Sequence, residues 1–92
     1  MKIVVSCDQG GAEVLSSYLI NKIDNKEYKY FLKGPAVKVF QNAKLITKNY
    51  KTKSIIPNNT NYAYFSMSWS DTFTKKIFLK CKKKNIKTEI VL

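Results

Sequence analysis

Residues 2–19 constrain the fold of this chain more than any other stretch. Ile3, Val4 and Val5 form a short, continuous β-branched run, which is typical of a strand buried on both faces of a parallel sheet. A turn at 6–11 ends in two glycines, and apolar side chains then recur at helical spacing at positions 12, 15, 18, 19 and 23. A strand, a glycine-bearing turn and a helix in this order open the doubly wound α/β folds of the Rossmann type.

The turn between this strand and this helix is the first candidate ligand site. Gly10 and Gly11 allow a ligand to approach the backbone closely, and the first helical turn offers unpaired N–H groups that suit an anion. The plainer interpretation is a turn that needs glycine only for its own geometry, because many such folds bind nothing there. The sequence leaves both interpretations open.

The rest of the chain alternates between strand and helix patterns. Strands are expected over 28–32, 62–67 and 86–92, with a further short strand at 45–46. Helices are expected over 35–43 and again up to a C-cap at Asn85, the latter with a buried stripe of Phe73, Ile77 and Cys81. This order predicts a single Rossmann-like domain over residues 1–92, with three α/β/α layers and a parallel sheet of four or five strands.

A ligand crevice is expected at the carboxyl edge of this sheet. The first strand should lie beside the 62–67 strand, so that the turns after both strands open at the edge where α/β domains usually bind ligands. Ser70 or Asp71 is the expected N-cap of the last helix. Trp69 is suited to stacking on a sugar or a base, although a core or interface position explains a tryptophan equally well. The expected ligand-binding residues are Cys7, Asp8, Gln9, Gly10, Gly11, Ser66, Ser68, Trp69 and Ser70.

Charge and hydrophobicity argue against several classes of function. The net charge is +11 and all 17 basic residues are lysines, whereas nucleic-acid readers and phosphate clamps generally use arginine for bidentate contacts. We therefore interpret the surface as solvated and lysine-rich, with only non-specific attraction to polyanions. No apolar run approaches the roughly 20 residues of a membrane span, and the N-terminus lacks the apolar core of a signal peptide, which predicts a cytoplasmic protein.

Few residues suit catalysis. The chain contains no histidine, so a general base would have to be Asp8, Glu13, Asp71 or a lysine. Glu13 and Asp71 are explained equally well by favourable positions in the first turns of helices. Cys7 and Cys81 lack the spacing of a metal site and are expected to be free thiols. We therefore expect no catalytic residue, metal or cofactor in this chain.

A series of short motifs runs through nearly the whole chain: Val-Val-Ser-Cys-Asp-Gln-Gly-Gly-Ala-Glu at 4–13, Ser-Ser-Tyr at 16–18, Lys-Gly-Pro-Ala at 33–36 with Phe40, Ser-Trp-Ser-Asp at 68–71, and Lys-Asn-Ile-Lys-Thr at 84–88. In these motifs the chain resembles the N-terminal half of bacterial surface-polysaccharide biosynthesis proteins with a glycosyltransferase-B-like, nucleotide-sugar-epimerase-like architecture. The resemblance implies a Rossmann-like half that faces a C-terminal half, with a nucleotide-sugar or a phosphorylated glycan in the cleft. It also implies that this half alone lacks transferase activity.

The chain departs from this family in two places. Family-like sequences have Gly-Thr-Ser-Trp where this chain has Ser66, Met67, Ser68 and Trp69, so the glycine is missing from that turn. The chain also stops on an apolar strand at 90–92. This ending favours a truncated protein or the first half of a two-domain protein, and an exposed last strand also favours a homodimer.

The position of Cys7 directly after the first strand leaves a second function open. A phosphotransferase-system IIB domain is a stand-alone module that takes phosphate on such a cysteine. Asp8 beside the thiol opposes this role, because its negative charge raises the thiol pKa and repels a phosphate. A low-molecular-weight tyrosine phosphatase is excluded, because it needs an arginine at the position of Glu13 and the chain has no arginine.

Overall fold

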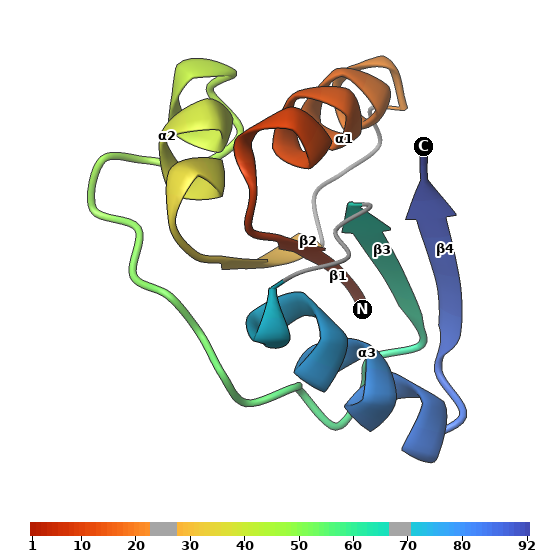
Figure 1. The fold of residues 1–92 in the computed structure, drawn as a ribbon. Coiled ribbons are helices and arrows are strands. Elements are labelled where there is room, and N and C mark those ends of the chain that lie inside the picture. Colours follow the sequence, from red (N-terminus) through yellow and green to blue (C-terminus); the bar gives the residue numbers. More distant parts are fainter. Residues whose placement is uncertain (23–27, 67–70) are drawn as a thin grey trace.

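The computed structural model describes residues 1–22, 28–66 and 71–92, which contain four strands and three helices (Figure 1). In chain order these are β1 (Lys2–Ser6), α1 (Gln9–Asn21), β2 (Tyr28–Leu32), α2 (Pro35–Asn42), β3 (Tyr62–Ser66), α3 (Thr72–Lys83) and β4 (Lys87–Val91). The alternation of strand and helix expected from the hydrophobic pattern is confirmed. Among the described residues, no helix combines the length and the apolar character that crossing a membrane requires.

The four strands form one parallel sheet in the order β2-β1-β3-β4. β1 pairs with β3 from Lys2 opposite Tyr62 to Val5 opposite Phe65, which confirms the expected neighbours. Helices α1 and α2 lie over one face of the sheet and α3 lies over the other (Figure 1). The domain is therefore a Rossmann-like α/β/α fold. Its strand order reverses between β1 and β3, the position at which open α/β sheets bind ligands.

The central strands bury side chains on both faces, because alternate residues of a strand point to opposite sides. Ile3 and Val5 of β1 pack with Phe65 of β3 against Ile77 and Cys81 of α3. On the other face, the cluster beneath α1 and α2 contains Val4, Leu15, Leu19, Leu32, Phe40 and Tyr64. The two-sided burial of β1 and the core position of Cys81 are confirmed.

Helix α1 begins earlier than its apolar pattern suggests. Gly10 and Gly11 lie inside its first turn, so their placement in the preceding turn is wrong. The reason is that Asp8 takes the N-cap position, and its carbonyl accepts a hydrogen bond from the Ala12 N–H at 3.1 Å. Position 23, assigned from the sequence to the apolar face of this helix, lies outside the described residues.

The expected short strand at 45–46 is also wrong. Lys44 has a positive φ of 61°, and the Leu45 N–H donates to the Phe40 carbonyl at 3.0 Å, so this stretch forms the turn that ends α2. Leu45 and Ile46 use their apolar side chains to pack against the cluster beneath α1 and α2. Asn85 has the same left-handed conformation, with φ 58°, but Lys84 is the C-cap of α3, so the expected C-cap at Asn85 is wrong by one residue.

The outer edge of β2 is closed by Tyr50, which belongs to the long segment between α2 and β3. The Tyr50 hydroxyl donates to the Tyr30 carbonyl at 2.7 Å and accepts from the Leu32 N–H at 2.8 Å. Ile56 of the same segment is buried on the α3 side of the sheet. The segment therefore wraps around this edge from one face to the other, and it satisfies main-chain groups that would otherwise be open to another strand.

Candidate functional site

The carboxyl ends of β1 and β3 are joined by two buried serines. The Ser6 hydroxyl donates to the Ser66 hydroxyl oxygen at 2.9 Å, and each serine is the last residue of its strand. Ser66 was expected to bind a ligand, and the structure places it beneath the edge, only 2% exposed. The pair holds the ends of the two central strands together at the point where the strand order reverses.

Cys7 directly follows β1, and its main chain also contacts the first turn of α2. Its carbonyl accepts a hydrogen bond from the Ala36 N–H at 3.0 Å, and the preceding Ser6 carbonyl accepts from the Lys33 N–H at 3.2 Å. Gly34, between these two donors, has φ 60° and ψ −141°, a conformation that is essentially restricted to glycine. The β1–α1 and β2–α2 connections therefore form one unit around Cys7.

The first turn of α1 is open at its N-terminal end. The N–H groups of Gln9, Gly10 and Gly11 precede the first intrahelical bond. Within the described residues, no side chain caps this end: the Asp8 carboxylate makes no cap bond, and its Oδ1 is buried without a partner. A Cβ added to Gly10 would meet nothing within 4 Å. The turn therefore has N–H donors without a partner among the described residues and open space at Gly10, with a buried carboxylate oxygen beneath it.

The N-terminal end of α3 differs from that of α1, because the side chain of its N-cap residue forms a capping hydrogen bond. The Thr74 N–H donates to Oδ1 of Asp71, which confirms Asp71 as the N-cap. Oδ2 of Asp71 is buried and has no partner among the described residues. Ser68, Trp69 and Ser70 of the expected site lie outside the described residues.

Two carboxylates act on the Cys7 thiol. Burial raises the pKa of this thiol above its ordinary value, and the charges of Asp71 and Asp8 raise it further, against an opposing effect of Lys33. The ammonium of Lys33, in the β2–α2 turn, lies 5.9 Å from the ring centroid of Phe73 in the first turn of α3, so the start of α3 borders the same edge, as expected. The thiol is kept protonated at neutral pH, which counts against a nucleophilic role.

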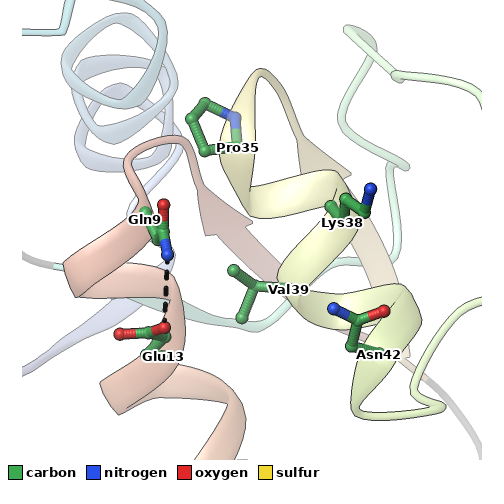
Figure 2. A pocket seen from close by; sticks show the side chains of 6 residues that line it. All are labelled: Gln9, Glu13, Pro35, Lys38, Val39 and Asn42. Carbon is green, nitrogen blue, oxygen red and sulfur yellow. Dashed lines mark hydrogen bonds between the residues drawn. The ribbon is translucent and has the colours of Figure 1, made fainter.

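A groove between α1 and α2 adjoins this edge (Figure 2). Its volume is about 340 Å³, which lies at the lower end of the range for small-molecule sites. Figure 2 shows Gln9 and Glu13 on one wall, with the Gln9 amide donating to the Glu13 carboxylate at 3.5 Å. The residues from α2 on the facing wall are Pro35, Lys38, Val39 and Asn42.

Sequence reasoning found one wall of this groove and missed the other. Gln9 was an expected ligand residue, whereas Lys38 and Asn42 were not considered. Lys38 and Asn42 lie one helical turn apart on α2, and this spacing puts their side chains on the same face of the helix. The spacing alone does not show that this face borders α1, because that depends on how the two helices pack on the sheet.

A change at Asp71 tests the electrostatic picture of Cys7. We expect Asp71→Asn to lower the pKa of the Cys7 thiol, because the substitution removes a nearby negative charge while keeping an oxygen that can cap α3. The pH dependence of alkylation by iodoacetamide measures this pKa, and the buried Cys81 should not react in the folded protein. Glu13→Gln is the matched control and should leave the profile of Cys7 unchanged. A thiol pKa that stays the same or rises in Asp71→Asn would contradict the arrangement.

Comparison with known proteins does not assign the chain to a group: no family model, no curated protein and no solved structure matches it. Among the described residues, no cluster of three or more histidine, cysteine, aspartate or glutamate side chains is arranged to hold a metal ion. The site therefore has to be interpreted from its own geometry.

Proposed function

We propose that the carboxyl edge around Cys7 to Gly11 binds a nucleotide-sugar or a phosphorylated glycan. In this proposal the chain is the N-terminal, glycosyltransferase-like half of a cytoplasmic protein of surface-polysaccharide biosynthesis, and it binds rather than catalyses. The observation that carries the proposal is the uncapped first turn of α1 at the point where the strand order reverses. Open N-terminal turns at this position bind phosphate groups in many α/β domains.

The groups at this edge suit a ligand that has both an anionic part and hydroxyl groups. The N–H groups of Gln9, Gly10 and Gly11, which have no partner among the described residues, can donate to phosphate oxygens. The Asp8 carboxylate, on a half-buried residue of the same turn, can accept a hydrogen bond from a sugar hydroxyl. Asp8 and Asp71 together disfavour a compact, highly charged anion such as free phosphate. A phosphate ester that carries a sugar satisfies both requirements.

The α1–α2 groove offers space for the sugar. It begins at Gln9, one of the residues of the open turn, and its walls carry the amides of Gln9 and Asn42 and the charges of Glu13 and Lys38. Amide and carboxylate groups can each pair with hydroxyls, and Val39 supplies an apolar surface for the C–H groups of a sugar ring. The net charge of +11 attracts such an anionic ligand from a distance.

Binding of UDP-, CDP-, GDP- and CMP-sugars to the wild-type chain and to Gly10→Val tests this proposal by calorimetry. We expect one nucleotide class to bind the wild type and to bind Gly10→Val at least about tenfold more weakly, a loss of about 1.4 kcal/mol. The valine side chain would occupy the open space over the first turn, where an added Cβ meets no atom within 4 Å. At a ligand concentration of 100 Kd, binding should also stabilise the wild type by about 2.7 kcal/mol.

Ser17→Val is the matched control, because it places the same β-branched side chain at an exposed position further along α1. This variant should bind like the wild type. Binding by none of the four classes, or equal affinity in Gly10→Val and wild type, would overturn the proposal. Transfer of a phosphoryl group from a phosphorylated carrier protein to Cys7, detected by mass spectrometry, would support the phosphotransferase-system alternative instead.

A further inference from the structure

The two edges of the sheet differ in whether another part of the described chain bonds to them. The β2 edge is closed by the Tyr50 hydroxyl, which bonds to main-chain groups of Tyr30 and Leu32. At the other edge, no strand of the described residues pairs with the outer side of β4. Ile90 on this strand is 46% exposed. An open strand edge with an exposed apolar side chain is a template for pairing with another strand.

The sequence of this edge is complementary to itself. Residues 86–90 read Ile-Lys-Thr-Glu-Ile. Two copies of a strand related by a two-fold axis run antiparallel, and each residue lies opposite its reflection through the central position. With Thr88 at the centre, Lys87 lies opposite Glu89 of the second copy and Ile86 lies opposite Ile90, each combination occurring twice. Opposite charges, threonine pairs and aliphatic pairs all stabilise neighbouring strands.

The faces of the strand agree with this pairing. Lys87 and Glu89 stand in register with Tyr62 and Tyr64, so they belong to the face covered by α1 and α2. Ile90 stands in register with Phe65, on the α3 face. Charged pairs would therefore form on one face of a joined sheet. On the other face the exposed Ile90 would lie next to Ile86, which precedes β4 and is buried in the core cluster beneath α3.

The carboxylate of Glu89 is already held in place. It accepts hydrogen bonds from the Tyr18 hydroxyl at 2.8 Å and from the Tyr62 hydroxyl at 2.6 Å. A carboxylate fixed in this way loses little side-chain freedom when a lysine of a second copy approaches it.

The neighbouring registers lack this complementarity. Centring the pair on Glu89 puts two glutamates opposite each other, which is unfavourable. Centring it on Ile90 puts Glu89 opposite Val91. Moving the centre of the strand pair by one residue gives every side chain a different residue opposite it. The charge pattern therefore favours the register centred on Thr88.

We propose that β4 pairs antiparallel with β4 of a second copy of this chain, centred on Thr88, and joins the two sheets into one. The partner is a second copy because the charge and apolar patterns of 86–90 complement themselves. A single strand pair buries a small interface, so the association depends on protein concentration. The net charge of +11 on each copy opposes it at low ionic strength.

Charge reversal with complementation tests the pairing by analytical ultracentrifugation in moderate salt. The wild type should show a mass that rises from monomer to dimer with concentration. Lys87→Glu and Glu89→Lys should each weaken self-association at least about tenfold, because each puts two like-charged pairs in the interface. An equimolar mixture of the two variants should regain a dimer of one copy of each. This mixture distinguishes strand pairing from the structural role of Glu89. If Glu89→Lys weakened self-association only because the tyrosine hydrogen bonds were lost, mixing it with Lys87→Glu would not restore the dimer.

The register is tested by crosslinking in a Cys7→Ser background, where the remaining native thiol, Cys81, is buried. Thr88→Cys should form a disulfide-linked dimer on oxidation, because the two cysteines lie opposite each other. Ile90→Cys should not, because it faces Ile86. Three results would each overturn the proposal: a wild type that stays monomeric up to about 1 mM, no recovery in the mixture of charge variants, or equal crosslinking at the two positions.

Discussion

Replacing Phe40 with alanine is expected to remove about 3–5 kcal/mol from the free energy of unfolding. Phe40 belongs to α2 and is fully buried against the sheet, and its ring lies edge-on to that of Tyr30 at 5.7 Å between centroids. The lost contacts and the cavity left behind both contribute to the cost. For a domain of this size, the melting temperature should fall by at least about 12 °C, which differential scanning calorimetry measures directly.

The control for this prediction is Leu79→Ala, which removes a large apolar side chain from an exposed position. Leu79 is 60% exposed on α3, so its loss should change stability by less than about 0.5 kcal/mol. Similar melting temperatures for Phe40→Ala and Leu79→Ala would contradict the packing of α2 on the sheet.

Gly34→Ala is expected to destabilise the domain by about 1–3 kcal/mol. The backbone of Gly34 lies at φ 60° and ψ −141°, and an alanine there is strained whatever the space around it. The space itself is sufficient, because an added Cβ would lie 3.7 Å from the Cys7 carbonyl oxygen and 3.9 Å from its sulfur. The cost is therefore one of backbone conformation, and chemical denaturation measures it.

Gly10→Ala also replaces a glycine with alanine, but we expect it to raise the free energy of unfolding rather than lower it. Gly10 lies in the first turn of α1 with no neighbour near its missing Cβ. Alanine should therefore stabilise the domain by up to about 1 kcal/mol through its higher helix propensity. If Gly34→Ala stabilised the protein, the placement of Gly34 at the N-cap of α2 would be wrong. If Gly10→Ala destabilised it strongly, the placement of Gly10 in the first turn of α1 would be wrong.

The periodicity of the sequence predicted most of the fold, because the apolar residues fall where tertiary packing needs them. The run of Ile3, Val4 and Val5 indicated a strand with two buried faces, and both faces are occupied. The position of Cys81 on the apolar stripe of the last helix indicated a core residue, and it is fully buried. The expected pairing of the first strand with the 62–67 strand followed from the topology of doubly wound sheets and is confirmed.

The features that the sequence did not predict depend on competing local bonds or on distant contacts. Leu45 and Ile46 have the composition of a strand, but the bond from Leu45 to the Phe40 carbonyl commits them to a helix-ending turn. Tyr50 closes the β2 edge by bonds to residues 18 and 20 positions away, and no local pattern signals such a contact. The α1–α2 groove likewise arises from the packing of two helices, so only its Gln9 wall was found.

The amide signals of the three glycines measure directly whether the open turn of α1 binds a sugar-bearing phosphate. Gly10 and Gly11 lie in that turn and Gly34 lies at the start of α2, so a chain labelled with nitrogen-15 only in glycine gives three amide signals, all from this edge. On titration with the nucleotide-sugar panel, we expect large shifts of the Gly10 and Gly11 signals with one nucleotide class and a smaller shift of the Gly34 signal. No movement of the Gly10 and Gly11 signals at saturating concentrations of every class would contradict binding at this turn.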